Sequence, residues 1–198
     1  IDLEAWLSGE VDVEFARQEG AGFFAGDGVN KPFGILTYVT GGANAAKHPF
    51  GAIGAINSGA AAAITADGLI DLVYDLPSAF TANARFAMNR KTMGAIRKLK
   101  DTEGNYLWQP SLIAGQPSTL LGFPVQDVAA IPDVAANAIA ALFGDFKQTY
   151  TVYDRKGVRV LRDPYTNKPY VMFYTTKRVG GGVHNPEPMR ALKIAASA

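Results

Sequence analysis

The chain has 198 residues, of which 19 are basic and 18 acidic, so its net charge is +1, and 48% of it is hydrophobic. A chain of this size can bury a core in one large domain or in two small ones that share it. The balanced charge lacks the basic excess that specific nucleic-acid-binding proteins use to neutralise phosphates. The chain has no cysteine, which excludes disulfides, thiolate nucleophiles and cysteine-ligated metals. The chain also has no apolar run of membrane-spanning length.

The first predicted element is a long amphipathic helix over residues 2–24. An apolar residue recurs at every fourth position along it: Leu3, Leu7, Val11 and Phe15. Acidic side chains fill the other faces, which is the pattern of a helix with one packed side. Three internal glycines each weaken this helix by about 1 kcal/mol relative to alanine. We therefore expect another part of the chain to pack on it.

The glycine-rich stretch 22-GFFAGDGVNKPFGIL-36 invites comparison with a phosphate-binding loop. Phosphate loops follow a strand and open a helix, whereas this stretch follows a helix and precedes a predicted strand over Ile35–Val39. Its amides then lie at a helix C-terminus, where the helix dipole repels anions. We interpret the stretch as a joint between two structural elements.

Helices and strands mix in the middle of the chain. Residues 41–63 are mostly glycine and alanine, and their pattern does not decide between a flexible and a closely packed segment. A helix capped by Thr65 or Asp67 is expected to end at Pro77, and a strand follows over Ala84–Asn89. The later elements are a basic amphipathic helix over 90–100, a turn at 101–105, an aromatic strand at 106–109, and strand-like segments at 120–128 and 139–155.

The last third alternates in the manner of a long β-hairpin. Apolar and polar residues alternate over 158–162 and again over 170–176, and 163-DPYTNKP-169 supplies turn residues between them. A helix, mixed elements and a hairpin together predict an α+β chain.

Three loop residues are candidates for catalysis: Asp27, His48 and His184. Neither histidine has a nearby carboxylate in sequence to orient it as a general base. Asp101 and Glu103 resemble the start of a calcium loop, but the residues that follow lack the later ligands. No catalytic, cofactor-binding or metal-binding residues are predicted, and no cofactor is expected.

Four segments in order resemble the major capsid proteins of tailed phages with the HK97-type fold. They are 19-EGAGFFAGDGVNKPFGIL-36, 84-ARFAMNRKTMGAIRKLKDTEGNYLWQP-110, the set 120-LLGFPV-125 with 131-IPD-133 and 143-FGDFKQTYTVYDRKG-157, and 158-VRVLRDPYTNKPYVMFYTTKRVGGGV-183. Each motif is weak alone, but the ordered set covers almost the whole chain. The resemblance implies a structural protein without enzymatic activity.

The resemblance also implies a two-part subunit. Residues 1–34 and 151–180 would form a peripheral domain, with a spine helix packed along the hairpin around Val158–Thr176. Residues 35–150 and 181–198 would form an axial domain, a mixed sheet flanked by helices, around five-fold and six-fold axes. The hairpin tip is a candidate assembly contact, expected to be exposed and without an intramolecular role: Asp163, Pro164, Tyr165, Thr166, Asn167 and Lys168.

Family members carry an N-terminal arm and an extended loop ahead of the spine helix, which do not match this chain. We therefore expect it to be a truncated form that builds no closed shell alone. Some members crosslink through a glutamate whose place falls near Thr176, but 170-YVMFYTTKR-178 contains no carboxylate, so we expect no crosslinking there.

As partners, the resemblance implies further copies of the chain, in pentamers and hexamers, and non-specifically packaged DNA, with no membrane. It places the protein in the virion after synthesis in the bacterial host cytoplasm. Two alternatives remain open at this stage: an encapsulin-like compartment shell, and a small-molecule enzyme that uses Asp27, His48 or His184.

Overall fold

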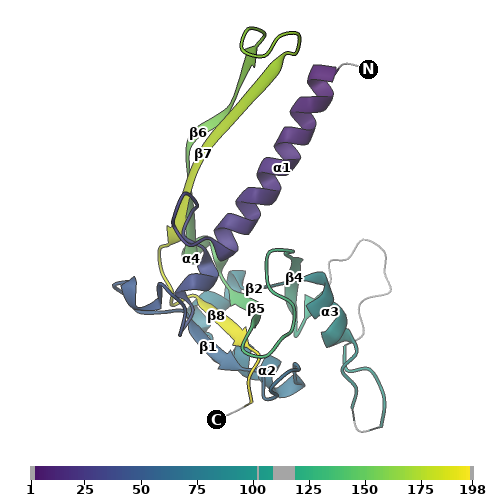
Figure 1. Ribbon diagram of the computed structural model, residues 1–198. Helices are drawn as coiled ribbons and strands as arrows, with labels where there is room; N and C mark the ends of the chain where they lie inside the picture. The colour runs from purple at the N-terminus through teal and green to yellow at the C-terminus, as the bar shows by residue number, and fades with distance from the viewer. Residues whose placement is uncertain (1–2, 102, 109–118, 197–198) are drawn as a thin grey trace.

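The computed structural model describes residues 3–101, 103–108 and 119–196. The strands are β1 (Gly54–Asn57), β2 (Arg85–Met88), β3 (Thr119–Leu120), β4 (Phe123–Asp127), β5 (Ile139–Gly144), β6 (Tyr150–Asp163), β7 (Met172–Val183) and β8 (Met189–Lys193). The helices are α1 (Leu3–Ala25), α2 (Ala66–Tyr74), α3 (Arg90–Arg97) and α4 (Phe146–Thr149), with 3-10 helices η1 (Ile35–Tyr38), η2 (Ala45–Lys47) and η3 (Ser78–Asn83). Figure 1 shows a compact lower body from which α1 and the β6–β7 hairpin project.

The body is built on a six-stranded mixed sheet with the order β1-β8-β5-β2-β4-β3. The pairs β1–β8 and β2–β4 are parallel, while β8–β5, β5–β2 and β4–β3 are antiparallel. The C-terminal strand β8 lies between β1 and β5, so the last described residues complete the sheet.

Successive residues of the central strands enter opposite faces of this sheet, as strand geometry requires. Phe86, Met88 and Phe143 join the core beneath α2 and α3, where Phe86 and Phe143 rings lie 4.5 Å apart. Ala87 and Leu142 join a second core on the opposite face, together with residues of η1. Both faces of the sheet are therefore covered.

Of the two residues predicted as caps of the first body helix, Thr65 is the N-cap of α2, and Asn89, which was expected to end a strand, is the N-cap of α3. The Thr65 hydroxyl accepts a hydrogen bond from the Gly68 amide at the start of α2, and Asn89 accepts one from the Thr92 amide at the start of α3. These side chains satisfy amides that have no partner within the helix.

The projecting arm consists of α1 and the hairpin, which leave the body in nearly the same direction from a common base near α4 (Figure 1). The hairpin forms its own two-stranded sheet, with Tyr150 opposite Val183 at the base and Asp163 opposite Met172 near the tip. Most of its residues beyond the base are exposed. The arm is therefore a thin projection and not a packed layer.

The predicted packing of the helix along Val158–Thr176 agrees with an ion pair that joins Glu19 of α1 to Lys177, midway along β7. α1 meets the hairpin at its base through Tyr150 and midway along β7 through Lys177, whose pKa Asp12, further out on α1, also helps to raise. The apolar stripe of the helix remains only partly covered: Leu7, Val11 and Phe15 are half-buried. Along β7, the residues on the side that carries Lys177 are half-buried, whereas those on the other side are exposed.

Three smaller predictions are corrected. Residues 35–38 form the 3-10 helix η1 and not a strand, because Gly34 and a local hydrogen bond from the Thr37 hydroxyl turn the chain. The predicted single strand 120–128 is a β3–β4 turn, in which Leu121 and Gly122 have positive φ. The predicted strand at 106–109 is an isolated bridge between Lys100 and Tyr106, and Gln109 lies outside the described residues.

Candidate assembly surfaces

The glycine-rich stretch is the joint of the arm, as predicted. A side chain at Gly26 would come within 2.1 Å of the Pro32 carbonyl oxygen, and one at Gly34 within 2.4 Å of the Gly26 amide nitrogen. Glycine is required because two turns of backbone touch directly here. The Gly34 amide donates to the Gly26 carbonyl oxygen at 2.8 Å. The loop folds back on the end of α1 and carries the chain into the body.

Tyr150 fastens this joint to the hairpin. Its hydroxyl donates to the Phe33 carbonyl oxygen at 2.7 Å, and its ring packs edge-on against Phe23 of α1 at 6.0 Å between ring centres. The Phe33 amide in turn donates to Gly181 of β7 at 3.1 Å. Burial raises the pKa of the Tyr150 hydroxyl to about 12, with a smaller contribution from Tyr38.

One ion pair joins the inner faces of the arm a little further out. Lys177 Nζ of β7 lies 2.5 Å from Glu19 Oε1 of α1, and both side chains are 21% exposed. The hydrogen bond to Glu19 raises the pKa of Lys177, and Asp154 and Asp12 add smaller coulombic contributions. Lys177 therefore neutralises the acidic inner side of the helix.

Charge is divided unequally between the two elements of the arm. α1 carries five carboxylates and one arginine, a net charge of −4. The segment from Tyr150 to Val183 carries seven basic and two acidic side chains, a net charge of +5. The near-neutral total thus conceals an acidic helix beside a basic hairpin.

The hairpin tip is exposed as predicted, with Tyr165 79% exposed at its end. Asp163 is the exception to the predicted lack of an intramolecular role, since it is half-buried and organises the turn. Its carboxylate accepts hydrogen bonds from the Tyr165 and Thr166 amides and from the Thr166 hydroxyl. These bonds lower the pKa of Asp163, the hydroxyl contributing most. The remaining tip residues present an ordered surface.

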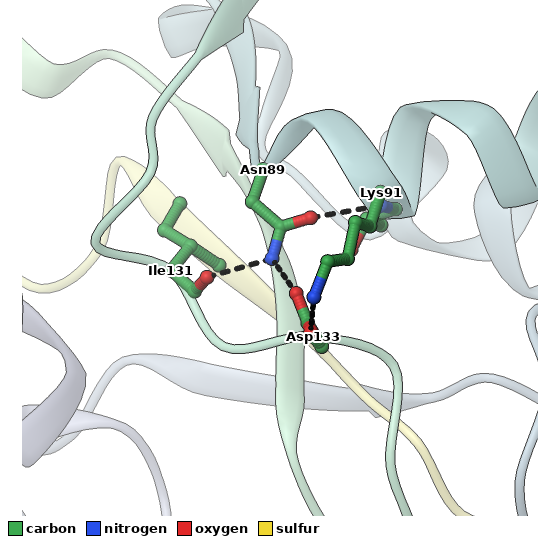
Figure 2. A network of polar contacts seen from close by, with 5 residues as sticks. Asn89, Lys91, Ile131 and Asp133 are labelled. Carbon is green, nitrogen blue, oxygen red and sulfur yellow. Dashed lines mark hydrogen bonds and ion pairs between the residues drawn. The ribbon is translucent and has the colours of Figure 1, made fainter.

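A polar network anchors the 128–138 loop to the start of α3 (Figure 2). The buried Asn89 side chain donates to the Ile131 carbonyl oxygen at 2.9 Å and to Asp133 Oδ1 at 2.6 Å. Lys91 Nζ binds the other carboxylate oxygen of Asp133 at 2.6 Å, and this bond lowers the pKa of Asp133. The network positions a body loop, while Lys91 itself is exposed.

The three candidate catalytic residues make separate hydrogen bonds and do not form one network, although His48 packs against Phe50. Asp27 accepts a hydrogen bond from the Val29 amide in the joint, and His48 accepts one from the Phe50 amide. His184 is exposed beside Phe50 in a shallow depression that contains neither of the other two. Among the described residues, no hydrogen bond or ion pair connects any two of the three. No described group of three or more His, Asp or Glu residues could hold a metal ion.

The structure also reveals contacts that sequence reasoning missed, namely Tyr150–Phe33, Glu19–Lys177 and Asn89–Asp133. The separation of an acidic helix from a basic hairpin was visible in the sequence and could have suggested the ion pair. The other contacts join distant positions and have no local signal. Within the described part of the chain, no helix is long and apolar enough to span a bilayer.

The fold and its exposed arm are shared with proteins that build shells. The capsid of the empty GTA particle is 46% identical with a TM-score of 0.88, over 98% of this chain and 67% of that one. The capsid of the native GTA particle is 46% identical with a TM-score of 0.89, over 98% and 66% of the two chains. This chain therefore spans about two thirds of the length of the GTA capsid chains. A search of curated proteins finds no match.

A more distant structure shares the fold alone. The SrpI encapsulin of Synechococcus elongatus PCC 7942 is 16% identical with a TM-score of 0.58, over 100% of this chain and 67% of the encapsulin. These likenesses define an α+β shell protein with the HK97-like fold.

The phage capsid family model matches residues 1–194. The chain belongs to the phage capsid family.

Proposed function

We propose that this chain is the body of a major capsid protein that assembles in many copies into the icosahedral shell of a phage or a phage-like particle. The observation that carries the proposal is the 46% identity with the GTA capsid over 98% of the chain. The exposed arm supports it, since a two-stranded hairpin is marginal in water and gains stability from further contacts.

The proposed subunit has two parts. Residues 1–34 and 151–180 form the peripheral part, and residues 35–150 and 181–198 form the axial part. The separate sheets of the hairpin and the body support this division. We place the body at the symmetry axes of pentamers and hexamers, and the GTA capsids, which were computed with C5 symmetry, support the pentamer.

DNA is the proposed content of the shell, held without sequence specificity. The near-neutral net charge gives the chain as a whole little attraction to phosphates, which fits DNA that is enclosed and not tightly bound. The protein would be made in the bacterial host cytoplasm and would end in the virion. The proposed role is structural, without a catalytic step.

The test is expression of the protein from its complete reading frame, followed by electron microscopy and by measurement of nucleic acid inside nuclease-treated particles. Closed icosahedral particles are expected, and soluble subunits alone at high concentration would contradict the proposal. Particles that hold an enzyme and no DNA would favour the encapsulin-like alternative. The SrpI encapsulin, 16% identical, shares the fold of this chain.

A further inference from the structure

Two outer faces of the arm carry exposed apolar side chains. On α1, Trp6 is 57% and Val13 67% exposed, and Glu10 lies between them on the same side of the helix. These three positions lie on the side of α1 away from Glu19, which marks the inner side through its bond to Lys177. At 3.6 residues per turn, the nine positions from Glu10 to Glu19 make about two and a half turns, which places these two residues on opposite sides of the helix. This outer helix face consists of Trp6, Glu10 and Val13.

The second face is the outer side of the hairpin. Leu161 and Tyr174 lie directly opposite each other and are 65% and 63% exposed. Because side chains alternate along a strand, even-numbered β7 residues lie on the side opposite to Lys177. The same outer side carries three cations, which form no ion pair within the described part of the chain: Lys156, Arg159 and Arg178.

The two faces are complementary in chemistry. One presents a tryptophan, a valine and a carboxylate, and belongs to a helix of net charge −4. The other presents a leucine and a tyrosine beside arginine and lysine, on a hairpin of net charge +5. Contiguous exposed apolar side chains with polar neighbours mark interaction surfaces. Within one copy the two faces point away from each other, so each needs a second molecule.

We propose that the outer helix face of one copy packs on the outer hairpin face of the next copy. Trp6 and Val13 contact Leu161 and Tyr174, and Glu10 pairs with Arg159. The two patches differ, so the contact is head-to-tail, the kind that closes into rings. This contact rests on the proposed function and names the partner surface within the shell.

The same observations argue against packaged DNA as the occupant of the hairpin face. Phosphates would be repelled by the acidic helix of the same arm, and Leu161 would gain no apolar neighbour from a duplex backbone. Opposite charges across a protein interface instead guide association and set the register of the two copies.

The first test exchanges charges in the protein expressed from its complete reading frame. We expect Glu10→Arg and Arg159→Glu each to lower the yield of closed particles at least about tenfold, because like charges then meet at the contact. The double variant restores the pair in reversed order and is expected to recover most of the yield. Lys47→Glu changes an exposed cation on the body and serves as the matched control.

The second test uses the absence of cysteine from all 198 residues. The double variant Glu10→Cys with Arg159→Cys should give a ladder of oligomers on a non-reducing gel after mild oxidation, whereas each single cysteine variant should give none. The two positions lie on opposite outer sides of the arm, so a bond within one copy would have to cross it. Thermal melting of every variant shows whether the subunit still folds.

The outcomes separate the contact from the proposed function. If the wild-type protein forms no particles, the proposed function is contradicted. The crosslink is then measured on concentrated subunits, and the absence of an oligomer ladder there contradicts the contact. Normal shells from both single charge variants overturn the contact. Normal shells from Arg159→Glu that have lost their nucleic acid assign the hairpin face to DNA and also overturn it.

Discussion

The Tyr150 hydroxyl donates a hydrogen bond of 2.7 Å to the carbonyl oxygen of Phe33, 117 positions earlier in the chain. Phe33 belongs to the loop that leaves α1, and Tyr150 begins the hairpin. The base of the arm is therefore held where its two elements enter the body. The Glu19–Lys177 pair joins the same two elements further out, midway along β7.

Removing this hydroxyl should loosen the base. We expect Tyr150→Phe to lower the free energy of unfolding by about 1 kcal/mol, since it leaves the Phe33 carbonyl oxygen without this donor. The ring contact with Phe23 is kept in this variant. Urea unfolding measures the change. Tyr153→Phe, at a position 65% exposed, is the control and should unfold like the wild type.

The same hydroxyl should make stability depend on alkaline pH. Burial raises the pKa of Tyr150 to about 12, so the folded state holds its proton at pH values where the unfolded state has lost it. The stabilisation is complete below the ordinary tyrosine pKa of about 10 and is lost as the pH rises through about 12. Unfolding free energies measured across this window should decline less in Tyr150→Phe than in the wild type. Equal declines would assign the alkaline loss to other groups.

Asn89 should matter more than its neighbour Lys91. Asn89→Ala removes a helix cap and two hydrogen bonds to the 128–138 loop, and we expect a loss of about 2 kcal/mol. Lys91→Ala removes only an exposed ion pair and should lower the free energy of unfolding much less than Asn89→Ala does. Chemical denaturation of both variants compares the two. Similar losses would show that the ion pair, and not the amide, anchors the loop.

The Glu19–Lys177 pair should show favourable coupling. Both side chains are 21% exposed, so we expect a favourable interaction free energy in a cycle of Glu19→Ala, Lys177→Ala and the double variant. Raising the salt concentration should reduce it only partly, since buried pairs are screened less than exposed ones. Additive effects of the two single variants would mean that the pair contributes nothing to holding the arm.

The hairpin tip should serve assembly more than folding. Replacing residues 164–168 by a short glycine turn removes exposed side chains while Asp163 and the strands remain. We expect an unchanged melting temperature of the subunit and a lower yield of closed shells from the complete protein. Calorimetry and electron microscopy are the two measurements. Equal melting together with equal shell yield would contradict a role for the tip in assembly.

The sequence determined by itself the elements whose signals are local. The four-residue apolar repeat predicted α1, the alternation of 158–162 and 170–176 predicted the hairpin, and Thr65 marked the start of α2. Gly26 and Gly34 also marked the joint after α1, where the close approach of two backbone segments leaves no room for a side chain. The ordered motifs were enough to indicate the family, which the comparisons confirm.

Only the tertiary structure decided how far the helix and hairpin contact each other. The apolar stripe of α1 predicted burial along the hairpin, and Leu7, Val11 and Phe15 of that stripe are only half-buried within one copy. A periodic stripe specifies that a face should be covered, and it does not specify whether the covering residues come from the same copy. That depends on the angle at which two distant segments leave the body, which is set by backbone contacts in the joint and not by the pattern of either segment.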